Sequence, residues 1–133
     1  MAQELAVNII VTGSESEKTI CSSVIGNSGV INLAGKLNLS ELTALLSLSD
    51  LVIANSTGPI HIAAALGKNV IGFYPKIHSA SPMRWGPYTS KGIVFQPKIP
   101  CSNCNRKQCE NLNCMNSIEV DEVFAKVKEI IEN

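Results

Sequence analysis

The sequence predicts an α/β domain, with a Rossmann-like parallel sheet that carries helices on both faces. Short β-branched runs alternate with helical segments, the links between them are short, and capping signals mark the helix starts. Crossovers between parallel strands are almost always right-handed, and the pattern therefore predicts one sheet with helices packed on each side.

The first strand is expected over residues 7–12, where a β-branched run closed by Gly13 predicts a strand buried on both faces. A helix should follow it, because Ser14 and Glu17 have the spacing of a capping box, and Gly26 should end that helix. Its predicted apolar stripe consists of Ile20, Cys21, Val24 and Ile25.

A second strand, over residues 30–33, and a second helix repeat the pattern. The helix should begin at Asn38, which has the capping-box spacing with Glu41. Its predicted buried stripe consists of Leu39, Leu42, Leu45 and Leu46.

The third strand, residues 51–54, should lead into a helix over residues 59–66, and a fourth strand is expected over residues 70–73. Pro59 at the first helical position and Gly67 just past the last one are typical helix boundaries.

After Tyr74 the periodicity stops over residues 75–91, a length that in compact domains usually indicates a functional loop. One more strand is expected over residues 92–95, and a cysteine-rich loop at residues 101–114 follows it. The last predicted helix carries one continuous apolar face, made of Val120, Val123, Phe124, Val127, Ile130 and Ile131.

The bulk composition favours a single globular domain over residues 1–133, because 45% of the residues are hydrophobic and 17% are charged. Eleven basic residues balance eleven acidic ones, so we expect no nucleic-acid partner. No apolar stretch reaches the roughly 18 residues of a membrane span. The first residues also lack the pattern of a signal peptide, and we expect a cytoplasmic protein.

Residues 55–61 follow the third strand and open the third helix, which is where open parallel sheets bind ligands. The hydroxyls of Ser56 and Thr57 can cap the helix or bind a phosphate oxygen. Gly58 lets a ligand approach the backbone, and the free amides of a helix N-terminus favour an anion. His61, in the first turn, is placed to donate a hydrogen bond to a phosphate or a ribose hydroxyl.

The pattern alone leaves a second interpretation of this segment equally open. In it, residues 56–59 are only a good helix start, and His61 is a partly buried packing residue.

The run at residues 50–67, from Asp50 to Gly67, resembles the signature of glycosyltransferase family 9, the heptosyltransferases of lipopolysaccharide core assembly. Residues 32–42 are similar to the preceding loop and helix of that family, and residues 81–88 to the loop after its fourth strand. The cysteines followed by Met115 and Ile118 resemble the tail of many members. The resemblance covers nearly the whole chain and implies the C-terminal half of a GT-B fold, which binds the nucleotide-sugar donor.

The resemblance assigns donor-binding roles to several residues of this chain. Thr57, Gly58 and His61 would bind the diphosphate and the adjoining sugar of a donor such as ADP-heptose. Glu15 would meet the ribose hydroxyls, which suits a carboxylate that accepts two hydrogen bonds. Lys36 and Leu37 would line the nucleoside end. No further cofactor is implied.

Two of these assignments have an open alternative or a departure from the family pattern. Glu15 is also a first-turn acid that the helix dipole favours without any ligand. Ser56 stands where many members have an aspartate, and this departure leaves a donor other than ADP-heptose open.

The resemblance covers only the C-terminal half of the family's two-domain proteins. The N-terminal half carries the lipopolysaccharide core acceptor and the catalytic carboxylate, and an inverting transferase needs such a base. No residue of this chain is assigned as catalytic. We therefore expect an excised domain or a split-gene product that binds donor weakly and transfers nothing unaided. Any peripheral contact with the inner membrane would come through the full-length protein.

The cysteine cluster, Cys101, Cys104, Cys109 and Cys114, offers four thiolates for a structural zinc ion. Only the first pair has knuckle spacing and the loop is short, so free thiols or a disulfide are favoured over zinc. Two other functions stay open beside donor binding. One is a stand-alone nucleotide- or phosphate-binding module, and the other is a zinc or redox interaction protein organised by these cysteines.

The loop after the fourth strand contains Arg84 and Trp85, which can frame a donor cleft with a guanidinium and an indole. The alternatives are a solvated charge for Arg84 and a plug over the sheet edge for Trp85, and the plug is favoured. His78 is expected to be a solvated loop residue.

Overall fold

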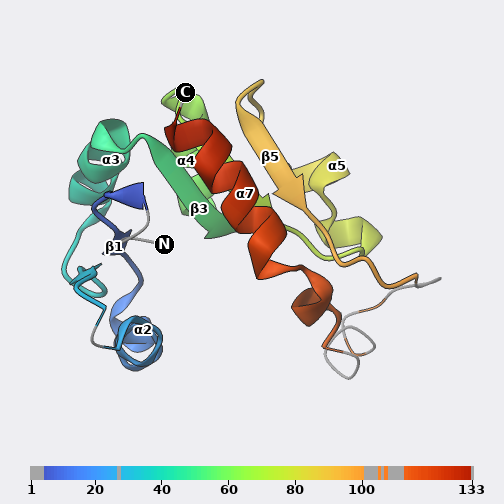
Figure 1. Cartoon of the computed structure of the whole chain (residues 1–133), viewed down its shortest axis with the longest axis horizontal. Helices are drawn as coiled ribbons and strands as arrows, with labels where there is room; N and C mark the ends of the chain where they lie inside the picture. The colour runs from blue at the N-terminus through green and yellow to red at the C-terminus, as the bar shows by residue number, and fades with distance from the viewer. Residues whose placement is uncertain (1–4, 27, 101–104, 106, 108–112, 133) are drawn as a thin grey trace. The chain divides into compact units, whose positions relative to one another are not determined.

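The structure, a computed structural model, describes residues 5–26, 28–100, 105, 107 and 113–132 (Figure 1). The chain forms two compact units, Met1–Ala44 and Leu45–Asn133. Each unit has its own parallel sheet and adjoining helices, which agrees with the predicted alternation of strands and helices.

The first unit is built on two short parallel strands, β1 (Ile10–Val11) and β2 (Ile31–Asn32), with Ile10 opposite Ile31. A 3-10 turn, η1 (Glu15–Glu17), and the helix α2 (Lys18–Ile25) connect them. The expectation that the first strand is buried on both faces is wrong, because 37% of Ile10 is exposed. Within the described residues β1 pairs with β2 alone, so the strand has one neighbour instead of two.

The apolar stripe of α2 is narrower than the sequence predicts. Cys21 and Ile25 are half-buried, and the Cys21 Sγ lies 4.0 Å from the carbonyl oxygen of Thr12. Ile20 and Val24 are 62% and 77% exposed, and no residue of α2 is fully buried. The helix thus turns one i, i+4 pair toward the strands and leaves the other in solvent.

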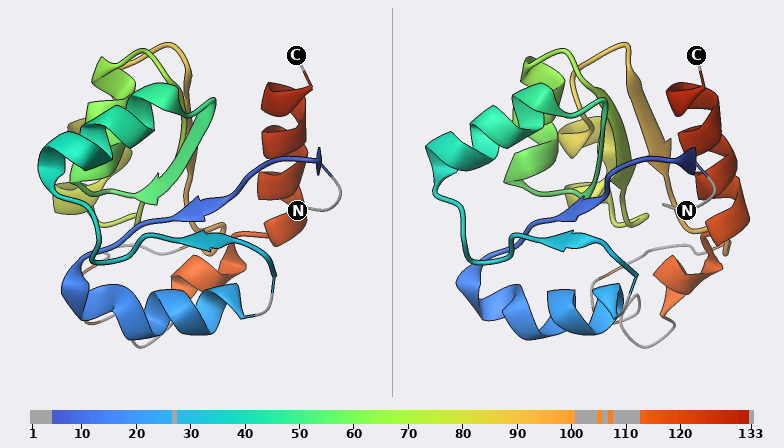
Figure 2. Two further views of the ribbon diagram at one scale, coloured as in Figure 1. Left: turned by 90° about the vertical axis from the view of Figure 1, so that its left-hand side faces the viewer. Right: turned by 60° about the vertical axis from the view of Figure 1, so that its left-hand side comes forward.

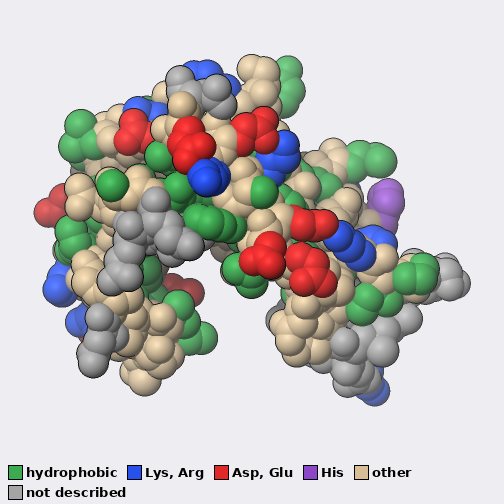
Figure 3. Space-filling model, viewed as in Figure 1, with side chains coloured by type: hydrophobic (Ala, Val, Ile, Leu, Met, Phe, Trp, Pro, Cys, Tyr) green, Lys and Arg blue, Asp and Glu red, His purple; other side chains and the backbone are tan. Residues whose placement is uncertain are grey.

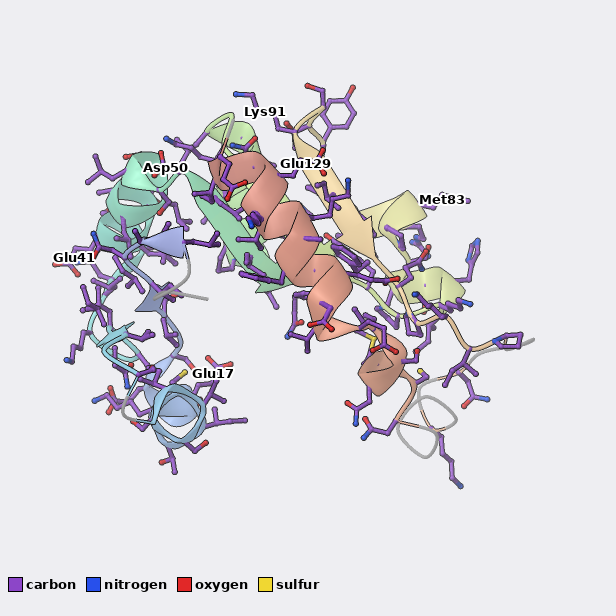
Figure 4. All side chains as sticks on the ribbon, in the orientation of Figure 1. Glu17, Glu41, Asp50, Met83, Lys91 and Glu129 are labelled. Atoms are coloured by element: carbon purple, nitrogen blue, oxygen red, sulfur yellow. The ribbon has the colours of Figure 1, made fainter. Side chains whose placement is uncertain are left out.

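At both predicted helix starts, the two residues of the predicted capping box are hydrogen-bonded to each other. The amide of Ser14 donates to the Glu17 carboxylate over 2.7 Å, and the Ser14 hydroxyl donates to the same oxygen over 2.6 Å. These hydrogen bonds hold the pKa of Glu17 below its ordinary value, the hydroxyl contributing most. At the next helix, α3 (Leu39–Leu48), the Asn38 amide donates to Glu41 over 2.8 Å and the Glu41 amide donates back to Asn38 over 3.0 Å. Figure 4 shows Glu17 and Glu41 at these two helix starts.

The stripe predicted for α3 is buried toward its C-terminal end. Leu46 is buried, Leu42 and Leu45 are half-buried, and Leu39 is 68% exposed at the first helical position.

The second unit contains a three-stranded parallel sheet in the order β3-β4-β5. The strands are β3 (Leu51–Asn55), β4 (Asn69–Phe73) and β5 (Gly92–Phe95), which match the predicted runs within one residue at each end. Asn55 pairs with Phe73 at the carboxyl end of the sheet, and Phe73 pairs with Phe95. The two phenyl rings lie with their centroids 6.0 Å apart.

The helices α4 (Gly58–Ala65) and α7 (Val120–Ile131) cover opposite faces of this sheet, as Figure 2 shows. The core between these layers is apolar except for the phenolic oxygen of Tyr74, and its buried side chains include Val52, Ile60, Ala63, Ala64, Val70, Ile71, Tyr74, Val123 and Val127. Burial of a side chain such as Ile60 contributes about 1.5–3 kcal/mol. The predicted arrangement of a parallel sheet between helices is confirmed in this unit.

The segment after β4 contains two short helical turns where the sequence predicts only a loop. They are η2 (His78–Ala80) and α5 (Pro82–Trp85), and Ser81 precedes the second. Figure 4 shows Met83 projecting outward from α5, in keeping with its 87% exposure. Four residues are too few for helical periodicity to appear in a sequence.

The terminal helix α7 agrees with the predicted bounds, and its apolar face is buried along most of its length. Val123 and Val127 are buried, whereas Val120 at the first position is 76% exposed. Its outer surface carries ion pairs such as Lys126–Glu129, at 2.6 Å, and Figure 3 shows acidic and basic side chains gathered there. Among the residues that the structure describes, no helix is long and apolar enough to cross a membrane.

Candidate functional site

The segment from Ser56 to His61 lies at the carboxyl end of the second unit's sheet. β3 ends at Asn55 and α4 begins at Gly58, so two residues form the whole link. Thr57 is the N-cap residue and has an extended backbone, with φ −135° and ψ 172°. The predicted placement of this segment, between the third strand and the third helix, is confirmed. Ligands of open parallel sheets bind at such a junction, so donor binding here stays a prediction.

The hydroxyl of Thr57 does not cap the helix. It donates instead to the carbonyl oxygen of Asn55 over 3.3 Å, and the Thr57 amide donates to the same oxygen over 2.7 Å. The residue is exposed. Its hydroxyl is held by one long hydrogen bond and can rotate toward a ligand in solvent.

Gly58 leaves a free space and an unpaired donor at the start of α4. A Cβ at this position would have no atom within 4 Å. The Gly58 amide makes no hydrogen bond within the described part of the chain, and the first turn is completed by the amide of Ile60, which donates to Thr57 over 3.3 Å. An unpaired amide at a helix N-terminus attracts an anion, and the space that a side chain would occupy at Gly58 is open to an approaching ligand.

His61 is exposed in the first turn of α4. The buried side of the helix is formed by Ile60, Ala63 and Ala64. The alternative in which His61 is a partly buried packing residue is therefore wrong, and the imidazole is free to meet a ligand at the helix start.

Sequence reasoning missed Tyr74, which follows β4 and is fully buried. Its phenolic oxygen has no hydrogen-bond partner of ordinary geometry among the described residues. Burial raises the pKa of Tyr74, and the nearby hydroxyl of Ser56 partly offsets that rise. The register of β3 and β4 is what connects Tyr74 to the site. Asn55 pairs with Phe73, so the next residues, Ser56 and Tyr74, are neighbours.

In the first unit, the structure brings Glu15 together with the loop that precedes Lys36. Gly35 has a φ of +67°, and a Cβ on it would stand 2.5 Å from Oε2 of Glu15. The other oxygen of Glu15 accepts from Lys18 over 2.6 Å. Lys36 is exposed and Leu37 is half-buried. The residues predicted for the nucleoside end thus come from two adjoining loops that follow β1 and β2.

Of the cysteine cluster, only Cys114 lies within the described residues. It is buried and unpaired in η3 (Cys114–Ser117), and Cys21 in α2 is also a free thiol. Cys101, Cys104 and Cys109 lie outside the described residues, so the choice between zinc, free thiols and a disulfide stays a prediction.

Trp85 does not plug a sheet edge. It is 51% exposed, and its indole nitrogen donates to the carbonyl oxygen of Ser79 over 2.9 Å. Arg84 and His78 are exposed, as expected for loop residues.

Comparisons with known proteins find similarity to heptosyltransferases. A model of glycosyltransferase family 9 (heptosyltransferase) matches residues 1–115. The chain is 49% identical over 111 residues to the lipopolysaccharide core heptosyltransferase OpsX of Haemophilus influenzae, and the alignment covers 74% of this chain and 30% of that protein. It is 22% identical over 134 residues to lipooligosaccharide heptosyltransferase 2 of Campylobacter jejuni, which covers 95% of this chain and 41% of that protein.

The fold is also that of a solved structure, the ADP-heptose lipopolysaccharide heptosyltransferase II of E. coli. The TM-score is 0.75 at 19% identity, over 98% of this chain and 39% of that one. The chain therefore spans about two fifths or less of the length of the proteins it matches.

Proposed function

Because the chain belongs to glycosyltransferase family 9, the heptosyltransferases, we propose that it binds the nucleotide-sugar donor of a transferase of lipopolysaccharide core synthesis. The observation that carries the proposal is the start of α4. There, the Gly58 amide has no hydrogen-bond partner among the described residues, the position of a Gly58 side chain is open, and His61 is exposed one turn away. A diphosphate matches this arrangement, because it is an anion that needs hydrogen-bond donors and close backbone approach.

Within this proposal Thr57, Gly58 and His61 bind the diphosphate, and Ser56 lies beside them. Glu15 binds the ribose hydroxyls through the carboxylate oxygen that Lys18 leaves free, and Lys36 and Leu37 contact the nucleoside. The solved relative named for ADP-heptose supports an adenine nucleotide as donor.

The proposed role of this chain is donor binding and not transfer. The acceptor site and the catalytic base belong, in this proposal, to an N-terminal domain that completes the family's two-domain architecture. We therefore expect no glycosyl transfer when the chain alone is mixed with ADP-heptose and a lipopolysaccharide core acceptor. A measured turnover would contradict that part of the proposal.

The binding proposal is tested by calorimetric titration with ADP, UDP, GDP and CDP. We expect ADP to bind, and we expect His61→Ala to weaken binding about tenfold, which equals the loss of roughly 1.4 kcal/mol from one charge-assisted hydrogen bond. Gly58→Ala keeps the backbone amide but adds a Cβ beside it, so it should also weaken binding about tenfold, by blocking the close approach of the diphosphate. Its melting temperature should stay the same or rise, because the new Cβ meets no protein atom within 4 Å and alanine favours a helix over glycine.

The chain supplies its own control for the histidine. It has two histidines, and His78 is exposed in the same unit, at the start of η2. His78→Ala should bind ADP as the unaltered chain does. Equal losses from the two histidine variants, or no response to any of the four nucleotides, would remove the support for this site.

A further inference from the structure

The phenolic oxygen of Tyr74 is a buried polar atom that the packing of the second unit does not use. Tyr74 has no exposed surface, and its hydroxyl has no partner of ordinary geometry in the described part of the chain. A buried hydroxyl without a partner destabilises the folded state, and tyrosine hydroxyls in protein interiors usually find one. A phenylalanine would fill the same space without this penalty.

The tyrosine ring is held firmly in place. The Tyr74 amide donates to the carbonyl oxygen of Phe95 over 3.0 Å, which continues the pairing of β4 with β5. Gly72 leaves room for the ring, since a Cβ there would stand 2.6 Å from Cε2 of Tyr74 and 2.6 Å from Cδ1 of Ile60. The phenolic oxygen therefore has a fixed position.

That position is beside Ser56, two residues before α4. The register that pairs Asn55 with Phe73 makes Ser56 and Tyr74 neighbours at the carboxyl edge of the sheet. Ser56 is half-buried, and its hydroxyl is close enough to influence the titration of Tyr74. The Gly58 amide, which has no partner within the described part of the chain, lies at the same helix start.

We propose that Tyr74 is a positioning residue for anion binding: its phenol donates to the Ser56 oxygen, which directs the Ser56 hydrogen toward an oxygen of a ligand diphosphate. The proposal rests on the donor-binding function proposed above. The phenol is a hydrogen-bond donor without a partner of ordinary geometry among the described residues. The Ser56 hydroxyl can accept one hydrogen bond while it donates another. The resulting chain of two hydroxyls provides a donor to the anion, as the Gly58 amide does.

The experiment is a double-mutant cycle on ADP affinity, with the full chain and the variants Tyr74→Phe, Ser56→Ala and the two combined. We expect Tyr74→Phe to weaken ADP binding about fivefold, and to have no effect once Ser56 is alanine, because the phenol acts only through the serine. Ser56→Thr keeps the hydroxyl and should retain most of the affinity. Adenosine, which has no phosphate, should bind alike to all four proteins of the cycle.

Thermal stability separates this role from simple packing. Tyr74→Phe removes an unpartnered buried hydroxyl, so its melting temperature should stay the same or rise while its ADP affinity falls. Unchanged ADP affinity in Tyr74→Phe, with binding by the unaltered chain intact, would overturn the positioning role and leave the donor-binding function standing. A loss of equal size in the Ser56→Ala background would also overturn it. If the unaltered chain binds no ADP, both proposals are wrong.

Discussion

Gly72 and Tyr74 share one space in the core of the second unit, because a Cβ on Gly72 would overlap the ring of Tyr74 at 2.6 Å. The same Cβ would stand 2.6 Å from Cδ1 of Ile60, which is fully buried and has little room to shift. We predict that Gly72→Ala lowers the free energy of unfolding by about 1–3 kcal/mol through overpacking. Urea unfolding followed by circular dichroism measures this. A variant as stable as the unaltered chain would show that the ring has another place to go.

Gly35 is constrained both by a left-handed backbone and by close neighbours, whereas Gly67 has only the left-handed backbone. Both have a positive φ, +67° and +71°, but a Cβ on Gly35 would also meet the backbone of Glu15 at 3.0 Å, whereas one on Gly67 would meet nothing within 4 Å. Gly67→Ala should lower the free energy of unfolding by about 1–2 kcal/mol, the penalty of left-handed backbone. Gly35→Ala should lose about 1–3 kcal/mol more. The same denaturation experiment compares them, and equal losses would argue against the close approach of Glu15.

The burial of α7 can be tested with two valines in one helix. Val127 is 3% exposed and Val120 is 76% exposed. Val127→Ala removes the two buried γ-methyl groups and should lower the free energy of unfolding by about 2 kcal/mol. Val120→Ala should change it by less than about 0.5 kcal/mol. Similar effects of the two substitutions would mean that α7 packs on the sheet through another face.

The hydrogen bonds from Ser14 predict a specific dependence of stability on pH. They lower the pKa of Glu17 in the folded protein below its ordinary value of 4.5, so the folded state favours the ionised carboxylate. This contribution is complete above the ordinary pKa and is lost as the pH falls through the lower, folded value. Glu17→Gln should remove that part of the pH dependence.

The measurement is the melting temperature of both proteins across the acid range. The difference between the unaltered chain and Glu17→Gln should shrink as the pH falls below 4.5. A difference that stays constant with pH would mean that the carboxylate titrates alike in the folded and unfolded states.

The elements of the second unit were readable from the sequence because their signals are local. Pro59 and Gly67 bracket α4, and the β-branched runs of β3, β4 and β5 stand between turn residues. The first unit was less predictable. The apolar side chains of Ile20 and Val24 have helical spacing, but which i, i+4 pair is buried depends on the strands beside α2 and not on the helix itself.

The site shows the same division between local and long-range information. The helix start at residues 56–61 is contiguous in the chain, and its residue types alone indicated an anion site. Tyr74 lies eighteen positions beyond Ser56, and only the pairing of β3 with β4 makes them neighbours. A tyrosine at the end of a buried strand is ordinary in a sequence. Its hydroxyl becomes informative because the residues that the structure describes offer it no partner of ordinary geometry.

The tight packing of α4 has a consequence for binding kinetics. Ile60 and Ala63 have no exposed surface, and Gly58 and His61 belong to the same helix, so the helix backbone and the Gly58 amide are held in place before any ligand arrives. Little conformational entropy remains to be lost there on binding. The observed rate of association should rise in proportion to nucleotide concentration without reaching a plateau, because this part of the protein has no slow rearrangement to complete.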